Sequence, residues 1–471
     1  MKGNRLMAAL TTTAVVAAAG GSTALATGWF SGHPHHHGHP GQAEVLRSFH
    51  DHHPKNVIFF LGDGMGTQEI TAARYYQGVE NDLNVDRMPF TGFDTTWSVK
   101  PAARAPYLPD YDPDSASTGT SWATGEKTLD ERISQGPSSD ISVPGANLKT
   151  VLELAQKQGK KVGDVSTAEI TDATPAVLAS HISLRGCQGP ANMGACASET
   201  KAAGGLGSIA EQEVDHKVDV LLGGGRGRFE QRVAGGPFDG RSVVEQAQSK
   251  GYQYVTDATG LAGIRSASRP VLGLFHPSNM SLEWSGPAAT LGKGNAPVAC
   301  SENQRPANEP SLAAMTDKAI KLLDNKKGFF LQVEGASIDK QDHATNACGQ
   351  LGETVAFDSA IGVALDYQRT HPDTLIVVTA DHSHTSQIVS EDAGGSGLPT
   401  GWSTNLTTKD GQTLSLTYGT AGFGGDGRAP VAAPPSQQHT GAVVPVWGKG
   451  PGALDVLGTN DHTDLFDLLQ G

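Results

Sequence analysis

Residues 56–66 read Asn56-Val-Ile-Phe-Phe-Leu-Gly-Asp-Gly-Met-Gly66. An unbroken apolar run that ends in glycines is typical of a strand buried on both faces of a parallel sheet. In open sheets of this kind, ligands bind beyond the carboxyl ends of the strands, which is where the carboxylate of Asp63 stands. A tight turn in which Asp63 caps the next helix explains the same residues equally well.

Similar apolar runs recur along the chain, and amphipathic stretches separate them. We expect further strands at residues 162–165, 218–222, 271–275, 329–333 and 374–379, and crossover helices at residues 148–158, 311–325 and 352–369. This alternation predicts an α/β fold, a three-layer α/β/α sandwich with a largely parallel central sheet. Residues 394–434 are rich in Gly, Thr and Ser and predict a loop insertion, with a small antiparallel excursion at residues 412–418.

The composition describes a globular chain and excludes one class of partner. Of the 471 residues, 37% are hydrophobic and 18% are charged, which suits a chain that can bury a large core. The formal net charge is -14. Binding the phosphate backbone of a nucleic acid requires an excess of positive charge, so we expect no nucleic-acid scaffold as a partner.

The N-terminus has the pattern of a secretory signal peptide. Lys2 and Arg5 precede an apolar run from Leu6 to about residue 20, and Ala24-Leu-Ala26 follows as a small-x-small cleavage site. The run is shorter than the ~20 residues that span a bilayer, so we expect no stable membrane insertion. Residues 1–26 are therefore the expected signal peptide, and the mature protein is expected to be periplasmic or secreted. Residues 27–54 form a His-rich segment that we expect to be flexible and outside the active site.

Export places the cysteines in an oxidising compartment. An even number of cysteines there suggests two disulfides, with three pairings to choose from, and we expect neighbours in sequence to pair. The four cysteines are Cys187, Cys196, Cys300 and Cys348.

Acidic and histidine side chains follow two of the expected strands. The segment Val333-Glu-Gly-Ala-Ser-Ile-Asp-Lys-Gln-Asp-His343 puts Glu334 at a strand end and Asp339 four residues before His343. On a helix, residues i and i+4 share a face and can hold one cation, although an ordinary ion pair in a charged turn is the simpler interpretation. The segment Val377-Val-Thr-Ala-Asp-His-Ser-His384 ends in a carboxylate and two imidazoles, a ligand set that suits Zn²⁺. A hydrogen-bonded histidine in a loop is the alternative there.

A hydroxyl-rich segment supplies the candidate nucleophile. Residues 112–124 read Asp112-Pro-Asp-Ser-Ala-Ser-Thr-Gly-Thr-Ser-Trp-Ala-Thr124. A helix that starts near Ser115 aims free N–H groups and its dipole at an incoming anion. A plain helix cap formed by Asp114 or Ser115 explains the same residues, and Ser117 is a rival nucleophile.

Six ordered blocks together resemble the bacterial alkaline phosphatase family. They begin near residue 55 and continue towards the C-terminus. The blocks are Gly62-Asp-Gly-Met-Gly66, Asp114-Ser-Ala-Ser-Thr-Gly-Thr120, Ser166-Thr-Ala-Glu-Ile-Thr-Asp-Ala-Thr-Pro175, Val333-Glu-Gly-Ala-Ser-Ile-Asp-Lys-Gln-Asp-His343, Thr379-Ala-Asp-His382 and Gln438-His-Thr-Gly441.

The resemblance implies two Zn ions, one Mg ion and a set of site residues. Ser115 corresponds to the phosphorylated serine, Arg185 to the arginine that clamps two phosphate oxygens, and Lys340 to a lysine that reaches phosphate through water. Asp172 corresponds to a residue that acts through metal-bound water. The implied metal ligands are Asp339, His343 and His439 for the first zinc, Asp63, Asp381 and His382 for the second, and Asp63, Thr174 and Glu334 for magnesium. The family's disulfides correspond to Cys187 with Cys196 and Cys300 with Cys348.

The implied activity is the hydrolysis of small-molecule phosphate monoesters through a covalent phosphoserine, with release of inorganic phosphate and an alcohol. Residues 55–471 would then form a single alkaline phosphatase catalytic domain that carries the insertion near residues 394–434, and a homodimer is implied by the family alone. Two alternatives are a phosphodiesterase or sulfatase on the same scaffold and an exported metal- or phosphate-binding protein without turnover. Arg185 together with Lys340 favours a dianionic monoester, and Ser115 beside a complete ligand set argues against mere binding.

Overall fold

The computed structural model describes residues 53–391, 401–421 and 436–471. The expected signal peptide, almost all of the His-rich segment and parts of the expected insertion lie outside these residues. A ten-stranded sheet forms the centre, in the order β20-β2-β19-β13-β1-β12-β5-β6-β8-β7. Its strands are β1 (Asn56–Gly62), β2 (Phe90–Thr95), β5 (Lys161–Glu169), β6 (Val220–Gly224), β7 (Gln253–Val255), β8 (Val271–Leu274), β12 (Phe329–Gly335), β13 (Thr374–Ala380), β19 (Val444–Lys449) and β20 (Thr459–Asp461).

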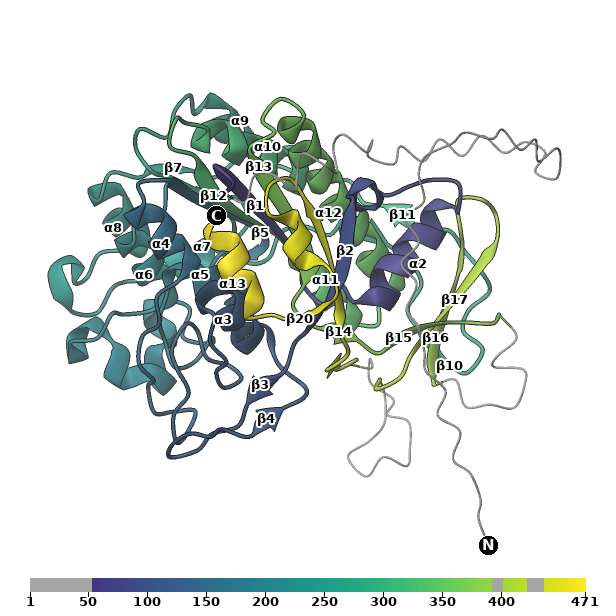
Figure 1. Ribbon diagram of the computed structural model, residues 1–471, viewed down its shortest axis with the longest axis horizontal. Helices are drawn as coiled ribbons and strands as arrows, with labels where there is room; N and C mark the ends of the chain where they lie inside the picture. The colour runs from purple at the N-terminus through teal and green to yellow at the C-terminus, as the bar shows by residue number, and fades with distance from the viewer. Residues whose placement is uncertain (1–52, 392–400, 422–435) are drawn as a thin grey trace, which may run out of the picture. The chain divides into compact units, whose positions relative to one another are not determined.

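Helices lie on both faces of this sheet, which confirms the predicted α/β fold (Figure 1). The expected strands and crossover helices all form, with ends that differ by a few residues. The helices are α2 (Thr67–Gln77), α3 (Ser115–Thr124), α4 (Val151–Lys157), α5 (Ala173–Ala179), α6 (Ile209–Asp215), α7 (Arg226–Phe229), α8 (Val243–Ser249), α9 (Ala258–Gly263), α10 (Leu312–Leu323), α11 (Ser337–His343), α12 (Ala347–Gln368) and α13 (Asp464–Gln470).

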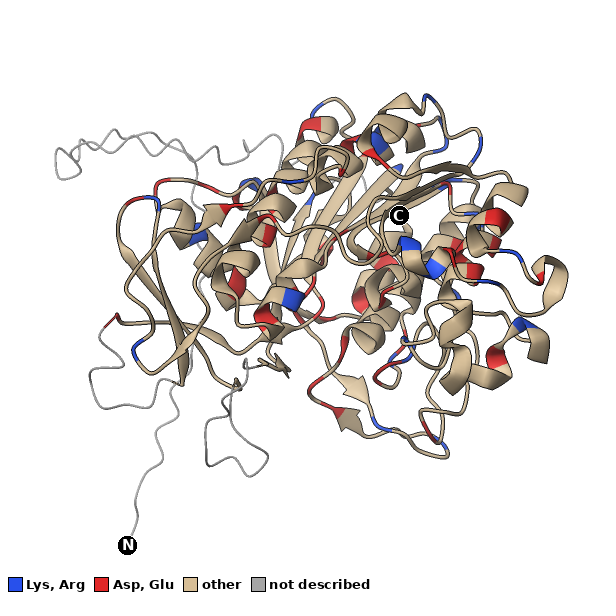
Figure 2. Ribbon diagram, turned by 180° about the vertical axis from the view of Figure 1, so that it is seen from behind, with Lys and Arg blue, Asp and Glu red and all other residues tan. Residues whose placement is uncertain are grey.

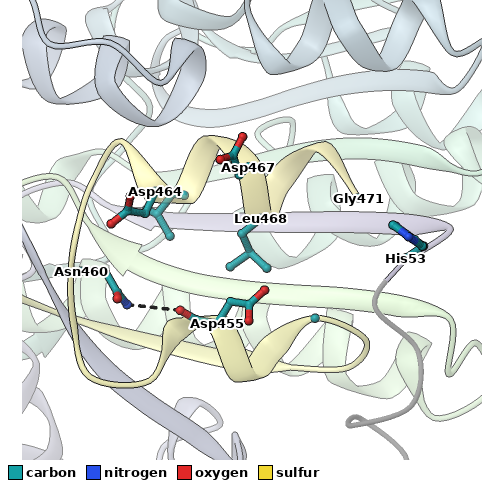
Figure 3. Close-up of a pocket in the computed structure, with 9 residues that line it drawn as sticks. His53, Asp455, Asn460, Asp464, Asp467, Leu468 and Gly471 are labelled. Carbon is teal, nitrogen blue, oxygen red and sulfur yellow. Dashed lines mark hydrogen bonds between the residues drawn. The ribbon is translucent and has the colours of Figure 1, made fainter.

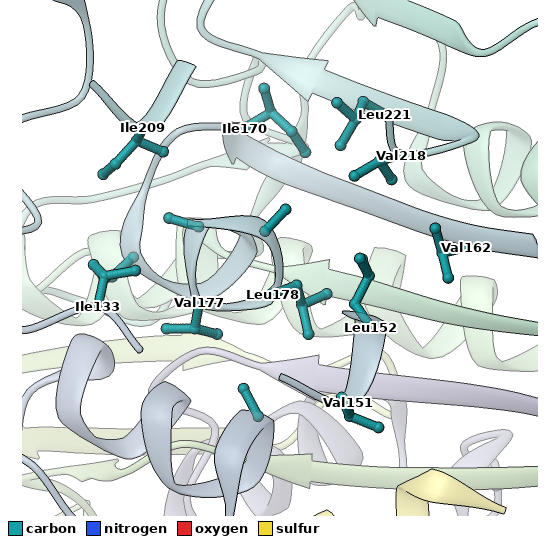
Figure 4. Close-up of a cluster of buried hydrophobic side chains, with 14 of the residues drawn as sticks. Ile133, Val151, Leu152, Val162, Ile170, Val177, Leu178, Ile209, Val218 and Leu221 are labelled. Atoms are coloured by element: carbon teal, nitrogen blue, oxygen red, sulfur yellow. The ribbon is translucent and has the colours of Figure 1, made fainter. Parts of the chain in front are cut away.

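Successive side chains of β1 point into opposite layers, as the period of a strand requires. Val57, Phe59 and Leu61 belong to one buried cluster, together with side chains of α3, α4, α5, α6 and α13. Ile58 and Phe60 belong to the other, with side chains of α10 and α12. Figure 4 shows part of the first cluster, where α4, α5 and α6 pack together over β5 and β6. The strand is therefore covered on both sides, as its unbroken apolar run predicts.

The sheet is largely parallel, and β19 runs antiparallel to both of its neighbours, β13 and β2. Four strands of this sheet, β2, β7, β19 and β20, were not expected from the sequence. The β2 segment alternates buried and exposed residues, and β19 contains Pro445 and Gly448, so neither is the continuous apolar run typical of a central parallel strand.

A second, four-stranded sheet has the order β10-β16-β17-β15. Its strands are β10 (Thr290–Leu291), β15 (Ser386–Val389), β16 (Trp402–Thr407) and β17 (Thr413–Tyr418). The β16 and β17 strands pair antiparallel, which confirms the excursion expected at residues 412–418. Shorter strands are β3 (Ser98–Val99), β4 (Pro109–Asp110), β9 (Trp284–Ser285), β11 (Ser301–Glu302), β14 (Ser383–His384) and β18 (His439–Thr440).

Two disulfides join Cys187 to Cys196 and Cys300 to Cys348. Acidic and basic residues are interspersed over the helices and loops (Figure 2). Among the residues that the structure describes, no helix is both long and apolar enough to cross a membrane.

Candidate active site

Three neighbouring strands each place a carboxylate at the carboxyl end of the parallel sheet. Asp63 directly follows β1, Asp381 directly follows β13, and Glu334 is the penultimate residue of β12. The parallel register pairs Leu61 with Glu334 and Gly62 with Ala380, so the three acids end their strands at nearly the same level. All three are buried. Strand order and register therefore bring together residues more than 300 positions apart in sequence.

The turn after β1 requires glycine. Gly64 has a φ of +68°, and its N–H donates to Asp381 Oδ1 at 2.9 Å. A Cβ at this position would lie 2.7 Å from Cδ2 of His384, too close for a side chain. Helix α2 has Gly66 as its N-cap residue and no side-chain cap, so Asp63 does not serve as a helix cap. The Asp63 carboxylate is turned instead toward His382, with Oδ1 3.6 Å from Nε2.

Ser115 is the first residue of α3, at the end of the helix that carries the positive pole of its dipole. Asp114 is the N-cap, and its side chain accepts a hydrogen bond from the N–H of Ser117. The Ser115 hydroxyl lies 3.3 Å from Nε2 of His382. The Ser117 hydroxyl instead donates to Asp130 at 2.7 Å. Of the two rival serines, Ser115 is thus the one that faces the histidine and carboxylate cluster.

The predicted ligands of the first zinc lie on α11 and β18. Asp339 and His343 share a face of α11 as the i, i+4 spacing predicts, with Oδ1 and Nε2 3.3 Å apart. His439 in β18 places its Nε2 3.4 Å from Asp339 Oδ1 and 3.0 Å from His343 Nε2. The ring of His439 also stacks on that of His382, with centroids 3.6 Å apart. The structure therefore brings both predicted zinc sets side by side.

His384 belongs to this cluster although the implied ligand sets omit it. Its Nε2 lies 2.6 Å from Asp339 Oδ1, and its side chain is fully buried. Asp339, His382, His384 and His439 bring one ligand atom each within 4.8 Å of one another. The sequence signal was the position of His384 two residues after His382, since alternate residues of an extended chain share a side.

Two cationic side chains converge on Asp172, and one of them also binds Asp114, the residue before the serine. Arg185 donates from Nη1 to Asp114 at 3.1 Å and from Nη2 to Asp172 at 3.0 Å. Lys340 donates to the second oxygen of Asp172 at 2.8 Å. Although burial opposes ionisation, the two cations hold the pKa of Asp172 well below its usual value, and the nearby carboxylates raise the pKa of Lys340 above its own. Asp172 thus orients both cations that the sequence assigned to phosphate.

The predicted magnesium ligands are buried and incompletely paired. The hydroxyl of Thr174 has no hydrogen-bond partner among the described residues. Glu334 accepts a hydrogen bond from Ser166, and burial raises the pKa of Glu334 to about 7. Carboxylate and hydroxyl oxygens are ligands that suit Mg²⁺, so this donor set fits the ion.

The predicted zinc ligands also include buried carboxylates that favour a bound cation. Within residues 53–391, 401–421 and 436–471, Asp63 Oδ1 and Asp381 Oδ2 are buried and make no hydrogen bond, and both face His382 Nε2, at 3.6 and 3.2 Å. Burial, followed by the negative charges of Asp339 and Asp381, raises the pKa of Asp63 well above its usual value. Buried carboxylates of this kind are costly unless a cation pairs with them. Their oxygens together with imidazole nitrogens form a donor set that fits Zn²⁺.

Similarity to known proteins identifies the family of the chain. The sequence model of the alkaline phosphatase family matches residues 54–423. The chain belongs to the alkaline phosphatase family. It is 47% identical over 423 residues to streptomycin-6-phosphate phosphatase of Streptomyces griseus, covering 88% of this chain and 89% of that protein. It is 43% identical over 439 residues to alkaline phosphatase of Escherichia coli K12, covering 91% and 88%.

Solved structures support the fold. The crystal structure of Thermus thermophilus alkaline phosphatase superposes with a TM-score of 0.62 at 20% identity, covering 91% of this chain and 93% of that chain. Membership of the alkaline phosphatase family identifies the chain as a metal-dependent phosphatase.

A pocket beside α13 is separate from the residues that match the alkaline phosphatase motifs (Figure 3). His53, Asp455, Asp464 and Asp467 are among its lining residues, and Asn460 donates to the backbone carbonyl of Asp455. None of its lining residues belongs to the predicted site, so we assign it no part in the chemistry.

Proposed function

We propose that this protein hydrolyses phosphate monoesters with Ser115 as the nucleophile, through a covalent phosphoserine. The observation that carries the proposal is the position of the Ser115 hydroxyl. It stands at the N-terminus of α3, 3.3 Å from His382, and the preceding residue, Asp114, binds Arg185. The serine thus lies next to a predicted zinc ligand, and the residue before it binds the predicted phosphate clamp.

We assign the metal ligands as the resemblance implies. Asp339, His343 and His439 would hold one Zn²⁺, and Asp63, Asp381 and His382 a second. Mg²⁺ would be held by Asp63, Thr174 and Glu334. When bound, these ions supply the positive charge that offsets repulsion between an anionic nucleophile and a phosphate dianion and that stabilises the attacking and leaving oxygens. His384 would act as a positioning residue, because its contact with Asp339 orients that carboxylate.

The residues of the chain position phosphate for in-line attack. Arg185 uses one N–H of each terminal nitrogen on Asp114 and Asp172, which leaves a second N–H on each nitrogen for two phosphate oxygens. Lys340 adds charge from the other side of Asp172. Ser115 loses its proton and its oxygen forms a bond to phosphorus, while the ester bond breaks and the leaving alkoxide takes up a proton. Water then cleaves the phosphoserine, which releases inorganic phosphate and restores the serine.

A serine pair in α3 provides the test. Ser115→Ala removes the attacking oxygen, so we expect no phosphoenzyme when the protein is quenched in acid after reaction with a radiolabelled monoester. Ser117→Ala is the matched control, because the Ser117 hydroxyl faces Asp130, and it should still be labelled. Labelled phosphate trapped on the Ser115→Ala protein would contradict the assignment.

A comparison of substrates decides between reaction types. Arg185 and Lys340 together suit two negative charges on the transferred group, so nitrophenyl phosphate should turn over far faster than bis-nitrophenyl phosphate or nitrophenyl sulfate. Faster diester or sulfate hydrolysis would favour the alternative enzymes. Binding of phosphate without multiple turnovers under excess substrate would favour an exported binding protein.

We further propose that residues 1–26 direct export, that residues 55–471 act as one catalytic domain, and that the protein works as a periplasmic or secreted homodimer. The two disulfides support an oxidising compartment. The homodimer rests on family resemblance and is tested by light scattering of the purified protein.

A further inference from the structure

A second group of metal-ligand side chains lies apart from the catalytic cluster. Glu153 comes from α4, His181 from the segment after α5, and His216 is the C-cap residue of α6. One ligand atom from each lies within 4.8 Å of the other two. None of the three belongs to the motifs that match the alkaline phosphatase family.

The hydrogen bonds around the two imidazoles determine where their lone pairs point. His181 Nδ1 lies 2.9 Å from the carbonyl oxygen of Ser134, and His216 Nδ1 lies 2.9 Å from the carbonyl oxygen of Gln212. A carbonyl oxygen only accepts, so both Nδ1 atoms carry a hydrogen. In the neutral rings the lone pairs are therefore on Nε2, and both Nε2 atoms face the same carboxylate oxygen of Glu153. This pattern of Nδ1–H to carbonyl with a free Nε2 is common among metal-bound histidines.

Three electron-rich atoms approach one another at this point. Lys149 Nζ donates to Glu153 Oε1 at 3.3 Å, and a proton on an imidazole or a cation between the three atoms would offset the remaining repulsion. Glu153 Oε1 is 3.6 Å from His181 Nε2 and 3.4 Å from His216 Nε2. Tetrahedral zinc with bonds of about 2.0–2.2 Å holds its ligand atoms about 3.3–3.6 Å apart. The two carboxylate–imidazole distances thus match those of a tetrahedral site and exceed the usual length of a direct hydrogen bond.

The three ligands are held by packed elements and remain open to solvent. Helix α5 packs on both α4 and α6, and Leu152, Leu178 and Ile209 belong to one buried cluster (Figure 4). The second carboxylate oxygen of Glu153 accepts from the N–H of Thr150, which fixes its orientation. His181 is 5% exposed and His216 is 23% exposed, so an ion can enter from one side. Lys149 Nζ, 3.3 Å from Glu153, is 77% exposed and free to move aside.

We propose that Glu153, His181 and His216 form an additional divalent transition-metal site, suited to Zn²⁺, with the fourth position open to water. Two imidazoles and one carboxylate are a recognised zinc ligand set. The ion would link α4 and α6 to the segment that leads from His181 to Arg185. Its role is therefore structural support of that segment, and it is separate from the three ions assigned to the active site.

Metal content of two single-histidine variants tests the site. The chain offers His371 as a control, a histidine whose Nε2 faces the carboxylate of Asp324 at 3.9 Å. After equilibration with buffered zinc, the wild type and His371→Ala should each hold about one more zinc per chain than His216→Ala, as measured by plasma mass spectrometry. All variants carry the same N-terminal histidines, so the difference reports this cluster. His216→Ala should still form the Ser115 phosphoenzyme and turn over monoester, which separates this result from failure of the proposed function.

A second variant guards against misfolding. Glu153→Gln keeps an oxygen that can accept from Thr150 but removes the ligand charge, and it should weaken zinc binding at the same site by about tenfold or more. Added zinc should raise the unfolding temperature of the wild type more than that of either variant. Equal zinc content in wild type and His216→Ala, at full occupancy of the active site, would overturn the proposal and leave a protonated histidine pair around Glu153.

Discussion

Replacing Arg185 by alanine tests the phosphate clamp most directly. The Arg185 side chain is 22% exposed, and its two terminal nitrogens are held by Asp114 and Asp172. The fork is therefore oriented before substrate arrives, and little side-chain entropy is lost on binding. Arg185→Ala removes both N–H donors aimed at phosphate. It also leaves Asp172 with Lys340 as its remaining cationic partner among these residues.

The size of the effect follows from the bonds lost. Loss of a buried bidentate, charge-assisted contact costs about 2–5 kcal/mol, which is roughly 30-fold to several-thousand-fold in affinity. Two effects favour a loss of binding free energy near the upper end of this range. The carboxylates of Asp114 and Asp172 lose a neutralising partner, and both then repel the phosphate dianion. We expect the Ser115 chemistry to survive, with substrate and product binding taking most of the loss.

The assay is competitive inhibition by inorganic phosphate during monoester hydrolysis, together with kcat and KM at saturating zinc and magnesium. Arg185→Lys is the matched control, because it keeps one positive charge but cannot donate from two fixed nitrogens; it should recover only part of the affinity. An unchanged inhibition constant for phosphate in Arg185→Ala would refute the assigned role of this side chain.

Three further predictions concern the metal cluster. Exhaustive dialysis against EDTA should abolish activity, with both zinc and magnesium needed for full recovery; undiminished turnover would contradict the ligand assignment. Gly64→Ala should lower activity. It should also lower the free energy of unfolding by about 1–3 kcal/mol, because a Cβ at this positive-φ position meets the side chain of His384. Gly194→Ala, where a Cβ meets open space, should have little effect on urea unfolding. Burial raises the pKa of Glu334 to about 7, and a ligand must lose its proton to bind a cation, so magnesium affinity should fall as pH drops below 7 and level off above it. Calorimetric titrations at pH 6, 7 and 8 that give equal affinity would contradict a raised pKa of Glu334 as the control on magnesium binding.

Local patterns predicted much of the scaffold. Continuous apolar runs identified the strands that are covered on both faces, including β1, β12 and β13, because burial on two sides leaves no polar alternation. The edge region around β2 and β19 was missed, because a strand with exposed residues, or one interrupted by Pro445, lacks that signal. The family resemblance supplied candidate site residues from short motifs.

Motif and periodicity thus specify which residues carry chemistry and roughly which elements hold them. They do not reveal that the Ser115 hydroxyl lies 3.3 Å from His382, that His384 contacts Asp339, or that His216 meets Glu153. Those contacts depend on strand order, on register and on how helices cross. Each of these is set by the summed packing of segments that are distant along the chain, so no local window of sequence contains the information.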